Sequence, residues 1–258
     1  MIALIFSTFA LWQEPAPTPT PPPPAEPAPA AAPAEPAAAA KPVVAWDDKT
    51  AKAAIDEFTQ LMKGTPNMAQ KNRALELFVG GANKQMVKPL SQVVETEKLL
   101  VIRKRAAELL ANQPAADANS VIRKLLKNAR VGSHPAVMAE LVRGLSRCGY
   151  QPAHWADISD LFEREYHLER VPVQEAVLEL VIAQKEKQAI SMLLRNLDEP
   201  VPENVDAQHN PPASYWEARW KSWAAWKGKV KDALFAVTGQ RFSTAAEAKA
   251  WLQKNPIK

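Results

Sequence analysis

Four tryptophans near the C-terminus have a spacing and a set of neighbours suited to binding another molecule. Trp216, Trp220, Trp223 and Trp226 follow one another at intervals of 4, 3 and 3 residues, which places them along one face of a helix. Arginine and lysine lie between them. Indole rings beside cations can stack on sugars or bases, or bind the side chains of a partner protein. The candidate partner-binding residues are Trp216, Arg219, Trp220, Trp223, Trp226 and Lys227.

The same stripe has a structural interpretation. A stack of helices is open at its end, and apolar side chains on the last helices are needed to cover it. The tryptophans are then expected to form a cap. Both interpretations hold if only part of the stripe is buried.

The residues that usually carry catalysis or bind metals show no such grouping. His134, His154, His167 and His209 are dispersed, with no second metal ligand at helical spacing. Cys148 is the only cysteine, so it cannot form an intramolecular disulfide, and we expect it to be a small core residue. The sequence contains no glycine-rich phosphate loop and no nucleophile elbow. We therefore expect a non-catalytic protein without cofactor or metal.

A repeat of 31 to 36 residues between Ile55 and Leu197 indicates the elements that position these side chains. Each unit contains two short amphipathic segments separated by a polar turn. In the second segment, an anchor residue is followed four positions later by another apolar residue, on the same helix face. These anchor pairs are Ala74 and Phe78, Ala106 and Leu110, Leu141 and Leu145, and Val177 and Val181.

The first segment of each unit has an apolar stripe of helical period, such as Ile122, Leu125 and Leu126. No segment alternates with period two, so the sequence predicts no sheet. A helix pair that recurs at this interval is typical of an α-solenoid, which usually presents a surface to a partner. We expect an all-α fold, with a right-handed solenoid of stacked antiparallel helix pairs over residues 44–197.

The repeats resemble the HEAT family. Residues 101–111, Val-Ile-Arg-Lys-Arg-Ala-Ala-Glu-Leu-Leu-Ala, are similar to the second helix of that repeat, and residues 135–145 and 172–177 are weaker copies. The period is shorter than is common in the family, but the tryptophan, Gly-Tyr and proline signature of tetratricopeptide repeats is absent. The resemblance covers about residues 47–197 and implies a fold, with almost no information about chemistry.

Two further segments follow the repeats. Residues 198–213 are rich in proline and acidic residues, and we expect a loop. Residues 214–258 contain nine Lys or Arg against three Asp or Glu, and we expect basic, tryptophan-rich helices. Gly239 has the position of a helix C-cap, and Thr244 with Glu247 forms a capping-box pattern before the last helix. This ending resembles the C-terminal piece of some bacterial HEAT-repeat proteins.

The N-terminal residues indicate export. Residues 1–12 form an apolar run with the length of a signal-peptide core, which is too short to span a bilayer. The run contains no Lys or Arg, in contrast to the basic start of the usual export signal. In residues 13–43, proline and alanine dominate, which predicts a disordered linker. We expect a periplasmic or secreted protein, or a cytoplasmic one if the apolar run is not a signal.

These features predict a monomeric, non-catalytic scaffold that binds a protein partner and has no transmembrane span. Two alternatives remain open. Some HEAT-like alkylpurine DNA glycosylases bind nucleic acid in a basic groove with aromatics, and the basic C-terminal segment permits such binding. However, residues 47–213 contain 22 basic and 22 acidic residues, which argues against it. The other alternative is an accessory role like that of the HEAT-like phycobilisome lyases, which predicts a tetrapyrrole pocket.

Overall fold

Helices dominate the computed structural model, which describes residues 42–202 and 210–257. The apolar run at 1–12 and nearly all of the Pro/Ala-rich segment at 13–43 lie outside the described residues. The α-helices of the described part are α1 (Asp48–Leu61), α2 (Met68–Glu76), α3 (Val87–Thr96), α4 (Leu100–Leu110), α5 (Ala115–Leu126), α6 (Ala129–Gly132), α7 (Pro135–Arg147), α8 (Trp155–Glu163), α9 (Val171–Gln184), α10 (Ile190–Arg195), α11 (Ala213–Thr238) and α12 (Ala245–Lys254). The all-α class is confirmed.

Local sequence signals account for several helix ends. The side chain of Asp47 accepts a hydrogen bond from the backbone N–H of Thr50 at 2.7 Å and so caps α1. Gly239 ends α11 in the left-handed conformation, with φ of 74°, as predicted. Thr244 caps α12 by accepting from the N–H of Glu247 at 3.2 Å. The reciprocal bond differs from the predicted capping box, because the Glu247 carboxylate accepts from the N–H of Ser243 instead of Thr244.

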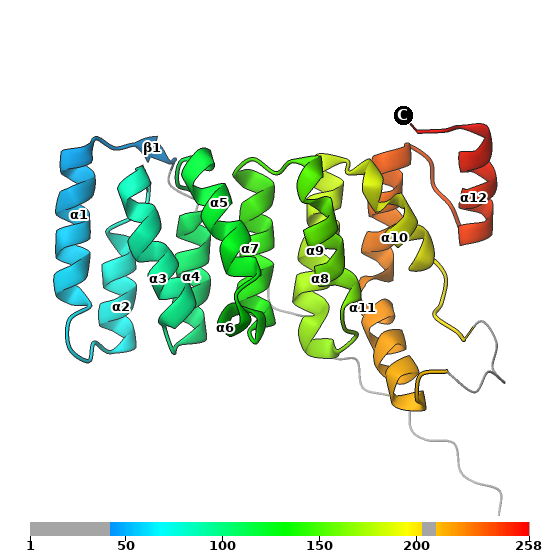
Figure 1. The fold of residues 1–258 in the computed structure, drawn as a ribbon, viewed down its shortest axis with the longest axis horizontal. Coiled ribbons are helices and arrows are strands. Elements are labelled where there is room, and N and C mark those ends of the chain that lie inside the picture. Colours follow the sequence, from blue (N-terminus) through cyan, green and yellow to red (C-terminus); the bar gives the residue numbers. More distant parts are fainter. Residues whose placement is uncertain (1–41, 203–209, 258) are drawn as a thin grey trace, which may run out of the picture. The chain divides into compact units, whose positions relative to one another are not determined.

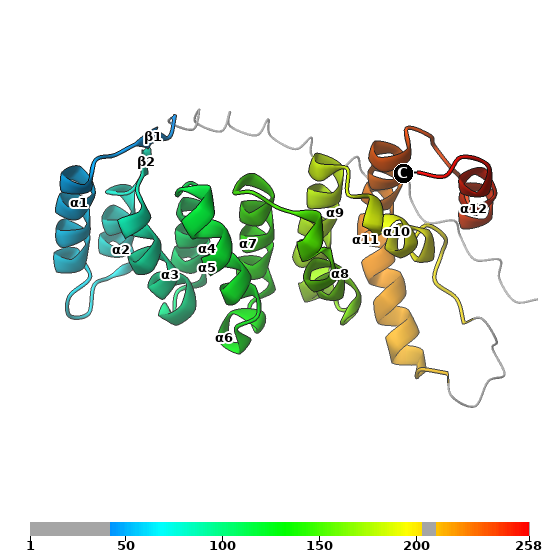
Figure 2. The same ribbon diagram turned by 45° about the horizontal axis from the view of Figure 1, so that its top comes forward.

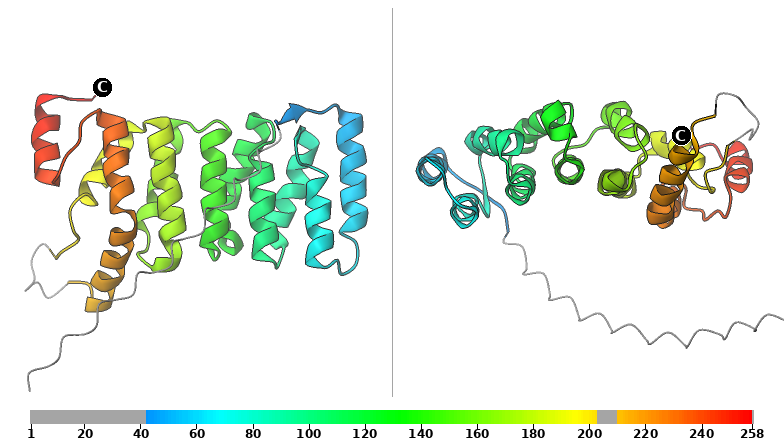
Figure 3. Two further views of the ribbon diagram at one scale, coloured as in Figure 1. Left: turned by 180° about the vertical axis from the view of Figure 1, so that it is seen from behind. Right: turned by 90° about the horizontal axis from the view of Figure 1, so that it is seen from below.

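The helices contact one another as successive pairs: α1 with α2, α3 with α4, α5 with α7, α8 with α9, and α10 with α11. The second members, α2, α4, α7, α9 and α11, also contact each other in that order. Figure 1 shows these helices side by side, and the right-hand view in Figure 3, from below, shows the first and second members as two rows. The long helix α11 is thus the partner of α10, and α12 packs on α10 (Figure 2).

The repeated anchor positions form the core. All four anchor pairs are fully buried, so the two members of each pair lie together on the core side of their helix. Burying a valine, leucine or phenylalanine side chain contributes about 1.5–3 kcal/mol relative to leaving it exposed. Gly144 shows how closely the helices approach, because a Cβ atom there would lie 2.9 Å from the Cβ of Ala111.

The prediction that the chain contains no sheet was wrong at one place. Val44–Ala45 (β1) and Gly81–Ala82 (β2) form a parallel pair of two-residue strands. The N–H of Trp46 donates to the carbonyl of Ala82 at 2.9 Å and extends the pairing. Gly81 makes this approach feasible, because a Cβ there would lie 2.4 Å from the Trp46 ring. Strands of two residues are too short to produce an alternating pattern.

Candidate functional site

The predicted tryptophan stripe lies on α11, and the structure divides it into buried and exposed parts. The helix packs against α9 and α10, and its buried side includes Ser222, Trp226 and Val230, which are four residues apart. Side chains on this side are fixed by the core, whereas those on the other side are free to meet a partner. The six candidate residues therefore cannot all act together.

Trp226 belongs to the core. It is 1% exposed, and its ring centroid lies 5.1 Å from that of Phe162 on α8. Its indole Nε1–H donates to the side-chain oxygen of Gln174 on α9 at 3.0 Å. Trp226 is therefore buried in the core in this structure, where it offers no surface to a partner.

Trp216 and Arg219 form a half-buried cluster with two tyrosines. The guanidinium carbon of Arg219 lies 5.1 Å from the ring centroid of Tyr166 and 5.6 Å from that of Trp216. Tyr215 completes the cluster by an edge-on contact with Tyr166 at 6.0 Å. These contacts hold the N-terminal part of α11 against the segment that follows α8. The cation is already engaged with two rings, which suits a cap better than a free platform.

Trp220 and Lys227 are exposed, and Trp223 lies half-buried beside them; we call these three residues the α11 edge. Trp220 is 46% exposed, and its Nε1–H donates to the carboxylate of Glu199. Trp223 is half-buried, and the ammonium of Lys227 lies 4.7 Å from its ring centroid. The α11 edge therefore presents indole surface and a cation on a helix that is anchored elsewhere by Trp226.

A chain of ion pairs connects α7, α9 and α11. Lys229 pairs with Glu175 and Glu179 of α9, at 3.2 and 2.7 Å, and Glu179 also pairs with Arg143 of α7 at 2.8 Å. Burial alone would raise the pKa of Glu179, but the bonds from Arg143 and Lys229 outweigh burial and hold it below its ordinary value. Part of the basic excess of the C-terminal segment is thus neutralised by carboxylates of the repeats.

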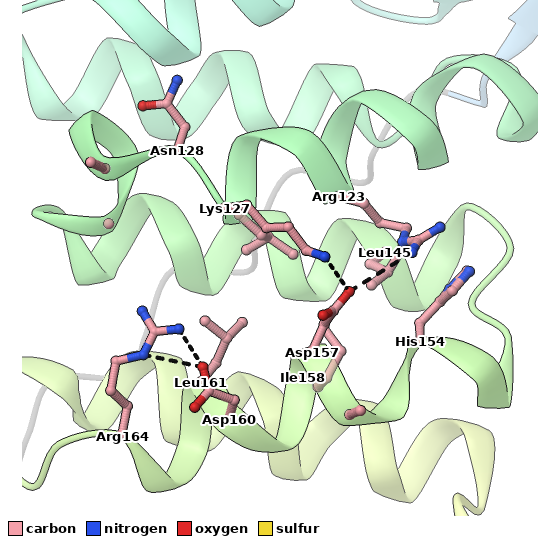
Figure 4. A pocket seen from close by; sticks show the side chains of 14 residues that line it. Arg123, Lys127, Asn128, Leu145, His154, Asp157, Ile158, Asp160, Leu161 and Arg164 are labelled. Carbon is pink, nitrogen blue, oxygen red and sulfur yellow. Dashed lines mark hydrogen bonds and ion pairs between the residues drawn. The ribbon is translucent and has the colours of Figure 1, made fainter.

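A cavity of about 410 Å³ lies between α5, α6 and α8, where no site was predicted. Its apolar lining includes Leu126, Leu145, Ile158 and Leu161. Figure 4 shows its charged lining: Arg123 of α5 and Lys127, the residue that follows α5, face Asp157 of α8, and Asp160 is paired with Arg164 beside them. Volumes of about 300–1,000 Å³ are typical of small-molecule sites. These five charged residues gave no signal in the sequence, because charged residues on amphipathic helices are normally solvated.

The three described histidines, His134, His154 and His167, belong to no group of potential metal ligands. His154 lines the cavity, where its Nδ1 accepts from the N–H of Gln151 at 3.3 Å. Burial and the nearby Arg123 lower the pKa of His154. His167 caps the turn that precedes α9, and His209 lies outside the described residues. Within residues 42–202 and 210–257, no three His, Cys, Asp or Glu side chains are grouped so that they could hold a metal ion.

The described helices include none with the length and apolar character needed to cross a bilayer. Comparison with known proteins adds no family: the chain matches no protein-family model, no curated protein and no solved structure.

Proposed function

We propose that this protein is a non-catalytic scaffold, built on a right-handed HEAT-like solenoid, that binds another protein through the α11 edge. The proposal is carried by one observation: Trp220 is half exposed on the same helix on which Trp226 is buried and hydrogen-bonded. A large aromatic side chain held on an anchored helix loses little conformational entropy on binding. Such residues dominate the binding energy of protein interfaces.

The order of helix contacts supports the solenoid part of the proposal. Each helix pair contacts the next through its second member, from α2 to α11. Repeat proteins with this connectivity provide extended surfaces, and each added pair enlarges the surface without changing the rest of the fold. A monomer with such a surface needs no second copy to bind its partner.

Nucleic-acid binding is less well supported. Lys229 contacts two carboxylates of α9, Lys221 pairs with Glu217, and Arg241 pairs with Asp232. Cations that are already paired gain less from neutralising phosphates, because the existing carboxylates repel the same backbone. The C-terminal segment therefore offers a weaker field than its composition indicates.

Affinity capture from extracts of the native organism tests the scaffold proposal. The wild-type chain is compared with a Trp220→Ala/Lys227→Ala variant, with and without nuclease. The matched control is Leu168→Ala, which truncates another exposed apolar residue, 56% exposed, away from α11. We expect a stoichiometric protein partner that survives nuclease, is retained by the control and is lost from the double variant.

The dissociation constants of the wild type and the double variant are then measured with the purified partner. Loss of one hot-spot tryptophan weakens binding by about 2 kcal/mol or more, roughly thirtyfold. Equal binding by the wild type and the double variant would reject the α11 edge as the interface. Recovery of nucleic acid, with every protein lost after nuclease, would reject the scaffold itself.

We also propose that the chain is exported, on the basis of the apolar run at 1–12. Fractionation of the native cells and N-terminal sequencing of the mature protein test this. A cytoplasmic protein that retains Met1 would refute export and leave the scaffold proposal unchanged.

A further inference from the structure

In the described part of the chain, helix α11 has another second member on one side only. The second members contact one another in the order α2, α4, α7, α9 and α11, so α4, α7 and α9 each lie between two others. α11 is the last of the row, as Figure 3 shows, and the helix that follows it, α12, packs on α10. The position that a further second member would occupy, next to α11, is therefore open.

The lysines of α11 identify the side that faces this position. Lys229 pairs with Glu175 and Glu179 of α9, so it points toward the preceding helix. Lys227 and Lys231 lie two residues before and after Lys229, which is a rotation of about 200° on a helix. They therefore point away from α9, and both are exposed. We call the side on which Lys227 and Lys231 lie the outer side of α11.

The outer side carries apolar surface that α11 does not bury in its own packing. Trp220 precedes Lys227 by seven residues, so it lies on this side and is 46% exposed. Phe235 follows Lys231 by four residues and is 40% exposed. The two aromatic residues are about 22 Å apart along the helix axis, which corresponds to about four turns. This is the footprint of a helix rather than of a single side chain.

Small residues separate the two aromatic ones. Ala224 and Gly228 follow Trp220 at intervals of four and so belong to the outer side. Gly228 is exposed, and a Cβ atom added to it would meet no other atom within 4 Å. The distance between two packed helices depends on the size of the side chains at their contact. Another helix can therefore approach α11 closely at this point.

The charge of the outer side determines which helix fits. Within the described residues, Lys221 and Lys229 are the lysines of α11 that form ion pairs, and Lys227 and Lys231 form none. Like charges four residues apart on a helix repel each other. A carboxylate placed between Lys227 and Lys231 is attracted to both, whereas a second copy of α11 is repelled.

We propose that an acidic amphipathic helix of the partner protein packs along the outer side of α11, in the position of a further second member. Its apolar side chains cover Trp220, Ala224 and Phe235, and its carboxylates pair with Lys227 and Lys231. Helix docking of this kind uses apolar anchors at helical spacing on the partner. The inference rests on the proposed scaffold function and adds the secondary structure and the charge of the segment that the partner presents.

Selection from a display library of random peptides of about 18 residues, roughly 27 Å as a helix, tests the inference on the full chain. We expect the wild type to enrich peptides with apolar residues at helical spacing and Asp or Glu beside them. A proline at the centre of an enriched peptide should abolish binding, because it breaks a helix. The Lys227→Glu/Lys231→Glu variant should enrich basic peptides and bind the acidic ones about tenfold or more weakly.

Control variants separate the outer side from general effects. Gly228→Gln places a bulky neutral side chain there without meeting another atom at its Cβ, and should weaken binding of the acidic peptides about tenfold. Gly228→Ala adds one methyl group and should behave as the wild type. The matched charge control is Lys49→Glu/Lys52→Glu, at two exposed positions of α1, which should enrich the same acidic peptides as the wild type.

Four outcomes would overturn the inference. They are enrichment of basic or proline-rich peptides by the wild type, enrichment of the same peptides by Lys227→Glu/Lys231→Glu, full binding after a central proline, and no enrichment at all. Capture from native extracts uses none of these peptides, so it reads the scaffold proposal separately. If a native partner is captured and lost from Trp220→Ala/Lys227→Ala while no acidic helix is selected, the scaffold stands and this inference alone fails.

Discussion

The indole N–H of Trp226 donates to the side-chain oxygen of Gln174 at 3.0 Å, between residues 52 positions apart. Gln174 is fully buried, and its amide nitrogen donates to the carbonyls of Phe162 and Glu165 at 3.1 and 3.3 Å. One glutamine of α9 thus ties α11 to the end of α8 and the turn after it. This contact fixes the rotation of α11, and with it the side of the tryptophan stripe that remains exposed.

Substitutions of Trp226 and Gln174 should lower the free energy of unfolding, and their effects should not be additive. Trp226→Phe leaves the oxygen of Gln174 unpaired in the core and should lower the free energy of unfolding by about 1–3 kcal/mol. Gln174→Leu should cost at least as much, because two carbonyls and one indole N–H lose their partner. Urea denaturation of the single and double variants gives the coupling energy, which we expect to be about 1 kcal/mol. Trp220→Phe is the control, with a change within about 0.5 kcal/mol. Additive losses would show that the hydrogen bond contributes nothing.

Two glycine substitutions should have opposite signs. Gly81→Ala forces a Cβ to 2.4 Å from the Trp46 ring and should lower the free energy of unfolding by about 1–3 kcal/mol. Gly228→Ala on α11 meets no atom within 4 Å and should raise it by about 0.5–1 kcal/mol, because alanine favours the helix. Thermal denaturation of both variants measures the difference. A stabilising Gly81→Ala would show that Trp46 does not pack against β2.

The single thiol should be unreactive in the folded protein. Cys148 is 3% exposed, and burial raises its pKa to about 11. Since the thiolate is the reactive form, Ellman's reagent at about pH 8 should modify no thiol in the native protein and one thiol per chain in guanidinium chloride. Rapid reaction of the native protein would mean that the α7 end opens readily to solvent.

Acid should remove a stabilising contribution of Glu97. Burial alone would raise the pKa of Glu97, but the hydrogen bonds from the Lys71 ammonium at 2.8 Å and the Leu99 N–H at 2.9 Å outweigh it and lower the pKa. A carboxyl with a lowered folded-state pKa stabilises the fold above its unfolded pKa, and this stabilisation disappears as the pH falls through the folded pKa.

The measurement is the free energy of unfolding of the wild type and Glu97→Gln between pH 7 and pH 3. The wild type should be more stable at pH 7, and the difference should shrink on acidification. Glu57→Gln, at an exposed position of α1, should follow the wild type throughout. A difference between the wild type and Glu97→Gln that is independent of pH would contradict this assignment.

The sequence alone determined the helix pairs, the buried anchors and several helix ends. Periodicity and capping depend on residues within one or two turns of each other, so anchors such as Ala106 and Leu110, and caps such as Gly239 and Thr244, are readable without a structure. The spacing of the four tryptophans also showed that they lie along one face of a helix. Its spacing could not show which indoles are buried, because that depends on how α11 rotates against α9.

Only the tertiary structure decided the remaining features. It buried a polar residue, Gln174, because three hydrogen-bonding groups from other segments converge on its side chain. It paired β1 with β2 across more than thirty residues. It also brought Arg123 of α5 within 3.8 Å of Asp157 of α8 in the lining of the cavity, because the distance between these two helices depends on how the helix pairs pack.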